Sequence, residues 1–170
     1  MKKLLLTLSI IAAFGFAASG QRYAIIDTKY ILDKMPEYKS AQKALDATAE
    51  TWQKEIDMRQ EALNKMYRDF DAEQVMLSED LKKKREDELF NKEKELRDMQ
   101  KKRFGFEGDL FKERQKLIKP VQDKVYTAVQ KLAAARSYDF ILDKSEGITV
   151  IFADPKLDKS EDVLRELGIK

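Results

Sequence analysis

The chain lacks cysteine and histidine, and among its 170 residues it has only 3 prolines and 6 glycines. Without cysteine it can form neither a disulfide nor a thiol nucleophile. Without histidine it has neither a Cys/His zinc site nor a histidine-based catalytic triad. Aromatic residues make up 9% and charged residues 38% of the chain, which leaves little apolar material for a large compact core.

The chain also lacks a large net charge, because its 33 Lys and Arg residues are nearly balanced by 31 Asp and Glu residues. A dedicated nucleic-acid-binding protein needs a net basic face, so we expect no nucleic-acid partner. The sequence contains no Gly-x-x-x-x-Gly-Lys-Ser/Thr motif for binding ATP phosphates. We therefore expect no cofactor, no metal and no catalytic residue.

Residues 1–20 have the pattern of a signal peptide. Two lysines precede an apolar stretch of 15 residues that ends at Ala18, shorter than the ~20 residues that span a bilayer. Small residues follow, which predicts cleavage after Gly20 and export to the periplasm; an uncleaved N-terminal anchor is the alternative. Cleavage removes two lysines from the 33 basic residues and leaves 31 basic and 31 acidic residues, net zero.

Residues 37–118 predict a helical arm, because apolar residues recur there at heptad-like spacings. The first series is Trp52, Ile56, Leu63, Met66, Phe70 and Leu77, and the second is Leu89, Leu96, Met99, Phe106, Leu110 and Leu117. The register shifts between the two series, and Ser78 followed by two acids is a good helix start. We expect two antiparallel helices with their tip near residues 75–80. One continuous helix with a stutter is the alternative.

Glycine and proline mark two further points of the arm. Gly105 and Gly108 lie within the predicted second helix, where each costs roughly 1 kcal/mol against alanine. They indicate either close helix packing or a hinge, and at both positions alanine is expected to stabilise a continuous helix. Pro36 suits the first turn of a helix, and Pro120 predicts a kink.

Residues 21–36 and 119–170 predict a small body that contains β-strands. Tyr23 to Ile26 is a short apolar run typical of a strand. Apolar residues alternate over 138–142 and again over 148–152, with a glycine-containing loop between, which predicts a β-hairpin. A short helix from Ser160 to Gly168 ends the chain. Three short strands are too few for a stable core, so we expect the body to self-associate, with the copy number left open.

The mature chain resembles the Skp/OmpH family of periplasmic chaperones. The resemblance rests on the strand from Tyr23 to Thr28, the charged helical hairpin, Lys119-Pro120 and a C-terminal block. That block contains the stretches Tyr138 to Asp143, Val150 to Pro155 and Asp162 to Leu164. The best-known members are strongly basic, whereas this mature chain is net zero, and Ser137 stands where a glycine usually precedes Tyr-Asp.

The resemblance implies a fold that is mostly α with a small β body. A long antiparallel helical hairpin would form a coiled-coil arm, and a few short strands from three chains would assemble into a trimeric β body. It implies a homotrimer that holds unfolded outer-membrane proteins between its arms without ATP. The expected function is a periplasmic holdase and not an enzyme. The alternative is a structural coiled-coil adaptor of the cell envelope that binds one folded partner.

Few residues stand out as candidate contacts. Met76 and Phe90 fall off the heptad seam near the tip and are candidates for client contact, since Met and Phe adapt to varied surfaces. The basic run Lys82, Lys83, Lys84 and Arg85 offers contact with an acidic client segment or weak contact with anionic lipid. The alternative is a solvated helix face paired with Glu86, Asp87 and Glu88. The carboxylates at strand ends, Asp27, Asp143 and Asp154, are interpreted as caps and turn formers.

Overall fold

The computed structural model describes residues 21–145, 147 and 150–169. The predicted signal peptide lies outside these residues. The chain divides into two compact units. The helical unit runs from Met35 to Lys124, and the sheet unit comprises the residues up to Lys34 and from Val125 onward. Among the described helices, none is both long and apolar enough to cross a membrane.

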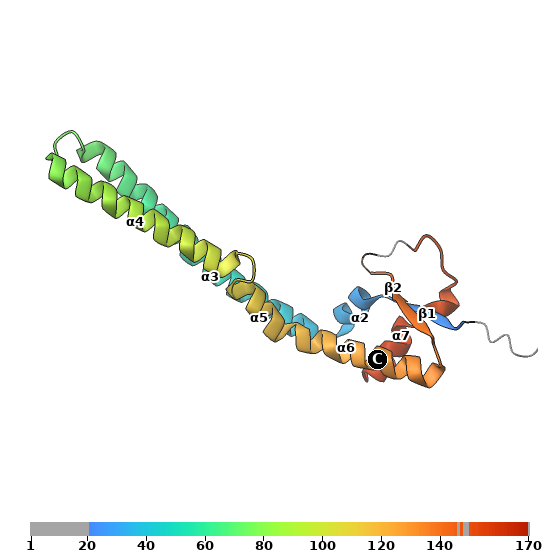
Figure 1. Ribbon diagram of the computed structural model, residues 1–170. Helices are drawn as coiled ribbons and strands as arrows, with labels where there is room; N and C mark the ends of the chain where they lie inside the picture. The colour runs from blue at the N-terminus through green and yellow to red at the C-terminus, as the bar shows by residue number, and fades with distance from the viewer. Residues whose placement is uncertain (1–20, 146, 148–149, 170) are drawn as a thin grey trace, which may run out of the picture. The chain divides into compact units, whose positions relative to one another are not determined.

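The sheet unit is built on two parallel strands, β1 (Tyr23–Ile26) and β2 (Phe140–Asp143) (Figure 1). Tyr23 lies opposite Phe140 in the register, and their rings stack with centroids 5.7 Å apart. The other three residues of β1 are buried, because an apolar run can be covered on both faces of a strand. Both strands lie in the segments predicted to contain the β-strands of the body.

Three short helical segments complete the sheet unit beside the last part of α6. They are α2 (Thr28–Lys34), η1 (Pro155–Leu157) and α7 (Ser160–Glu166). Helices α2 and α7 pack together, and their buried residues include Ile31, Val163 and Leu164. Gly168 has φ +75°, a left-handed conformation that ends a helix, as predicted for this glycine.

The predicted β-hairpin is wrong for the described residues. β2 pairs in parallel with β1, and residues 150–152 form no strand. Ile151 and Phe152 are instead largely exposed. The predicted first residue of the returning strand, Ile148, lies outside the described residues. Alternating apolar residues indicate a tendency to form a strand, but they do not identify the neighbour with which the strand pairs.

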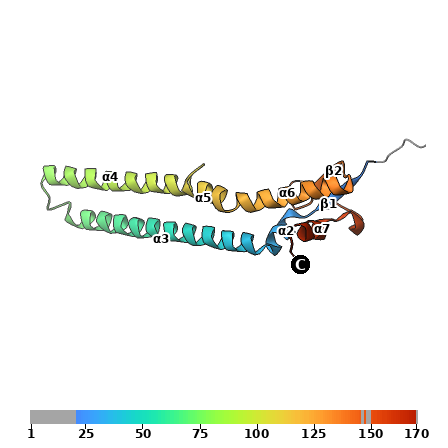
Figure 2. The ribbon, with the colours of Figure 1, turned by 90° about the horizontal axis from the view of Figure 1, so that it is seen from below.

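The helical unit contains α3 (Pro36–Glu73), α4 (Glu79–Phe104) and α5 (Asp109–Leu117). Pro36 occupies the first turn of α3, as predicted. α3 and α4 lie side by side, joined by a turn over residues 74–78 (Figure 2). The alternative of one continuous helix is wrong. α6 (Lys119–Arg136) follows a one-residue interruption at Ile118, two residues before Pro120, where a kink was predicted.

The seam between α3 and α4 is a cluster of four buried residues, Ile56, Leu63, Leu89 and Leu96. Met66, Phe70 and Met99 pack against it and are partly buried. All seven belong to the predicted heptad positions. The seam is therefore built from the predicted residues, and it buries one apolar stripe on each helix.

Candidate functional site

The helical unit is interrupted at residues 105–108, where the sequence predicts an unbroken second helix. Gly105 caps the end of α4 and Gly108 caps the start of α5. Between them, Glu107 has φ 53°, a left-handed backbone conformation that is uncommon for a residue with a side chain. Phe106, predicted to lie in the seam, is 98% exposed. That prediction is wrong because the helix ends before Phe106 and the chain turns outward.

Both glycines are required by close backbone approach. A Cβ atom added at Gly105 would lie 2.3 Å from the carbonyl oxygen of Lys101, and one at Gly108 would lie 2.7 Å from that of Lys102. Carbonyl oxygens of the main chain cannot move away as the end of a flexible side chain can. The expectation that alanine stabilises the helix here is therefore wrong, because no helix continues through these positions.

Arg103 braces the two sides of the break. Its guanidinium lies 2.8 Å from the carboxylate of Asp109, at the start of α5, and 3.9 Å from that of Glu55 on α3. It also lies 4.6 Å from the ring centroid of Trp52, a cation–π contact. Trp52 in turn meets Phe104 edge to face. Since these groups come from both helices and from α5, the break is a fixed feature and not a frayed end.

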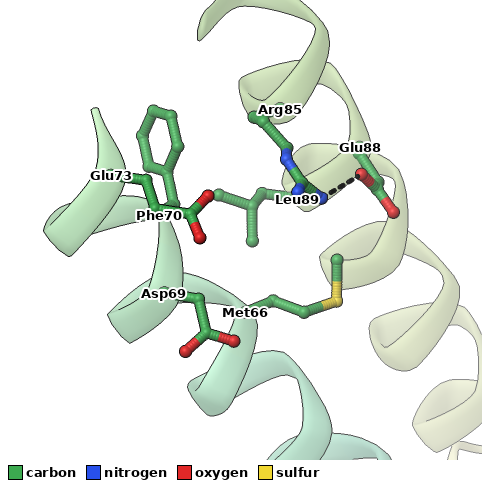
Figure 3. A pocket seen from close by; sticks show the side chains of 7 residues that line it. All are labelled: Met66, Asp69, Phe70, Glu73, Arg85, Glu88 and Leu89. Carbon is green, nitrogen blue, oxygen red and sulfur yellow. Dashed lines mark hydrogen bonds and ion pairs between the residues drawn. The ribbon is translucent and has the colours of Figure 1, made fainter. Parts of the chain in front are cut away.

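A small hollow lies near the other end of the helical pair (Figure 3). Met66 and Leu89 extend into the space between α3 and α4, and Arg85 pairs with Glu88 at 3.3 Å. The remaining lining residues are Asp69, Phe70 and Glu73. Because the apolar residues here also belong to the seam, the hollow is a shallow gap in helix packing, rimmed by charge.

The predicted contact residues Met76 and Phe90 both lie on the surface of the helical unit. Met76 is 83% exposed and Phe90 is 60% exposed. Val75, which is 91% exposed, and Leu81 were not singled out from the sequence. Val75 and Leu81 are absent from the heptad series, and this absence could have indicated that they are exposed. Phe70 and Leu77, assigned to the seam, are partly buried.

The basic run beside the turn is exposed but surrounded by acids. Lys83, Lys84 and Arg85 are exposed and Lys82 is half-buried. Residues 79–88 contain four basic and five acidic side chains, a net charge of −1. Arg85 pairs with Glu88, one of the partners expected for a solvated helix face.

The three carboxylates predicted at strand ends, Asp27, Asp143 and Asp154, act as local caps. The backbone N–H of Tyr30 donates to Asp27, and that of Lys156 donates to Asp154. Asp143 accepts hydrogen bonds from the backbone N–H and the hydroxyl of Thr28 and from the backbone N–H of Ser145. This agrees with the interpretation of these residues as caps. Within the described residues, no group of three or more acidic side chains is placed to hold a metal ion.

The pKa of Asp143 follows from this network. Partial burial by itself favours the protonated carboxyl, but the hydrogen bonds from Thr28 and Ser145 outweigh it and hold the pKa below its ordinary value. Asp158 behaves in the same way. Burial raises its pKa, and the opposing contacts with Lys144 and Ser160 lower it by more.

Comparison with known proteins identifies the family of this chain. A family model described as outer membrane protein (OmpH-like) matches residues 22–167. The chain belongs to the OmpH-like family. The family resemblance drawn from the sequence is thus confirmed.

The OmpH-like fold is also found among solved structures. A crystal structure from Caulobacter crescentus CB15, of an OmpH-like protein proposed to be an outer membrane chaperone, aligns with a TM-score of 0.68. The alignment covers 89% of this chain and 86% of that chain at 17% sequence identity, so the likeness concerns the fold. A search of curated proteins finds no match.

Proposed function

We propose that this OmpH-like protein is a periplasmic holdase chaperone that acts without ATP. It binds unfolded outer-membrane β-barrel proteins through its helical unit and prevents their aggregation on the way to the outer membrane. No bond is made or broken, so the activity needs no catalytic residue. The OmpH-like structure from Caulobacter crescentus, proposed to be an outer membrane chaperone, supports the chaperone class. The surface of the helical unit supports its use for client binding.

The observation that carries the proposal is the division of apolar residues in the helical unit. The seam residues are buried by helix pairing, so they are already satisfied. A second set, Val75, Met76, Leu81 and Phe90, is exposed on an otherwise densely charged surface. Charged neighbours keep the unit soluble, while Met, Leu and Phe can repack against varied unfolded sequences. Gly105 and Gly108 are proposed to be a hinge that stays closed while Arg103 pairs with Asp109 and bends when that pair opens, which fits the unit to clients of different size.

We further propose that the sheet unit assembles a homotrimer. A two-stranded sheet is marginal in isolation. Tyr23 and Phe140 remain partly exposed, and Ile151 and Phe152 are largely exposed, so apolar surface is available for burial between copies. Multi-angle light scattering should give three times the mass of the mature chain. A monomeric mass at micromolar concentration would contradict this assembly.

The structural adaptor remains the second candidate, because charged helical pairs also serve as spacers. A photo-crosslinking residue placed at Met76 or Phe90 separates the two in living cells. A holdase crosslinks to several outer-membrane precursors, whereas an adaptor crosslinks to one folded partner. The matched control is the same crosslinker at Glu50, an exposed residue of α3 that pairs with Lys54. Contact of Lys82–Arg85 with anionic lipid is expected to be weak, since acids flank the run.

A further inference from the structure

The break between α4 and α5 places a fully exposed aromatic ring on the helical unit. Phe106 is 98% exposed, and Phe104 and Phe111 are also exposed. Single exposed apolar side chains are ordinary on proteins. Here the exposure follows from ending one helix and starting another, which leaves Glu107 in a strained conformation.

The net charge around the break is positive, although the mature chain is neutral. Residues 101–119 contain seven basic and three acidic side chains, a net charge of +4. Residues 69–100 contain seven basic and eleven acidic side chains, a net charge of −4. The neutral total therefore hides a basic stretch, which coincides with the exposed phenylalanines.

Much of this positive charge is unused within the chain. Arg103 pairs with Asp109, Lys116 with Glu113 and Lys119 with Asp123. In the part of the chain that the structure describes, Lys101, Lys102, Lys112 and Arg114 form no ion pair, and all four are exposed. They remain available to negative groups on another molecule.

The break is also rigid enough to present these groups. The Arg103 brace ties α4 to α5 and to α3, and the N–H of Gly108 donates to the carbonyl oxygen of Gly105 at 2.9 Å. Because these contacts hold the backbone on both sides of Phe106, binding through its ring costs little additional ordering of the main chain.

We propose that Phe106, Lys101, Lys102, Lys112 and Arg114, here named the break surface, bind acidic segments of unfolded polypeptides that carry an aromatic or aliphatic side chain. The unpaired ammonium and guanidinium groups pair with carboxylates, and Phe106 contacts the apolar side chain. Charge complementarity selects the occupant, because the neighbouring region of the unit is itself net negative and favours no acidic ligand. This inference rests on the proposed function and names where, and for which sequences, the holdase makes one of its contacts.

The test uses the full mature chain and a fluorescein-labelled, unstructured 20-residue peptide with six Asp or Glu and two Tyr. A second peptide carries Asn and Gln in place of the acids. Fluorescence anisotropy should show the acidic peptide binding at low salt, at least about tenfold tighter than the neutral one, and weakening in 0.5 M salt. Phe106→Ser and the double variant Lys101→Gln/Lys102→Gln should each lower its affinity by about tenfold.

The matched control is Lys83→Gln/Lys84→Gln, which removes two exposed lysines from the net-negative region and should leave the affinity unchanged. Circular dichroism should give the same helix content for every variant, since all the altered side chains are exposed. Equal loss in the control and the break variants would overturn the proposal, because the effect would then be one of total charge.

Different results refute the holdase function and the break surface. A wild-type protein that leaves an unfolded β-barrel protein to aggregate refutes the holdase. A wild-type protein that suppresses aggregation, with break variants that bind the acidic peptide as tightly as it does, refutes the break surface alone. Either of two other results overturns the choice of an acidic polypeptide as the occupant. In one, the break variants lose binding only to vesicles with 30% anionic lipid and bind the acidic peptide as the wild type does. In the other, the break variants have a different oligomer mass from the wild type.

Discussion

The guanidinium of Arg103 reaches across the break in the helical unit and pairs with the carboxylate of Asp109 at 2.8 Å. Arg103 is also the residue that occupies the heptad position between Leu96 and Leu110, where the pattern calls for an apolar side chain. It lies over the ring of Trp52 there, so the position is filled by a cation–π contact. One residue thus closes the seam and fixes the break.

Replacing Arg103 by Met should destabilise the protein by about 1–2 kcal/mol, because it removes a partly buried ion pair and the contact with Trp52. The methionine keeps most of the apolar stem, so the loss reports the charge. Urea unfolding followed by circular dichroism measures it. Arg97→Met is the control, because the pair of Arg97 with Glu93 is more exposed and should contribute less than about 0.5 kcal/mol. Equal losses in the two variants would contradict the bracing role.

Alanine at Gly105 or Gly108 should destabilise the helical unit, since the new Cβ would meet main-chain oxygens at 2.3 Å and 2.7 Å. We expect a loss of about 1–3 kcal/mol for each variant. Asn91→Ala, in the exposed middle of α4, is the control and should stabilise by a few tenths of a kcal/mol. A rise in the melting temperature of both glycine variants would mean that the helix runs through the break.

The seam and the tip should respond differently to truncation. Leu63→Ala should cost about 2–5 kcal/mol, because Leu63 is buried in the seam cluster. Met76→Ala should change the free energy of unfolding by less than about 0.5 kcal/mol, because Met76 is exposed. Chemical denaturation of both variants tests this. A large loss for Met76→Ala would show that its side chain is needed for folding and is not free for clients.

Acid should weaken the sheet unit through Asp143. The folded pKa of this carboxyl lies below its unfolded value, so the stability it provides is complete above the unfolded pKa of about 4 and is lost as the pH falls through the folded pKa. Asp143→Asn should therefore lower the melting temperature more at pH 7 than at pH 3. Asp98→Asn, an exposed change on α4, should show no such difference. An equal effect of Asp143→Asn at both pH values would contradict the network with Thr28 and Ser145.

The seam could be predicted from the sequence, but the break could not. Ile56, Leu63, Leu89 and Leu96 follow one apolar stripe per helix, and burial of that stripe decides the packing whatever the details of the turn. Phe106 fits the same spacing but lies outside the seam. A glycine costs a helix only about 1 kcal/mol, so the glycines at 105 and 108 did not decide between a continued and an interrupted helix.

Pairing in the sheet unit shows the same limit. The strands at Tyr23 and Phe140 were expected from local composition, and they meet. Their parallel register could not be read from either segment, because it depends on where the intervening chain returns. The residues at 150–152 alternate in the same way and yet form no strand. Of the exposed apolar residues, Met76 and Phe90 were identified from the sequence because they fall off the heptad seam. The exposed Phe106 was missed because it fits the seam.

If this OmpH-like protein holds unfolded outer-membrane proteins, it must keep several unrelated ones from aggregating. The most direct measurement is light scattering after several unrelated, urea-unfolded β-barrel proteins are diluted into buffer without ATP, with or without the full mature chain. We expect stoichiometric amounts of the chain to suppress aggregation of all of them. Aggregation that proceeds unchanged, or suppression confined to a single folded partner, would contradict it.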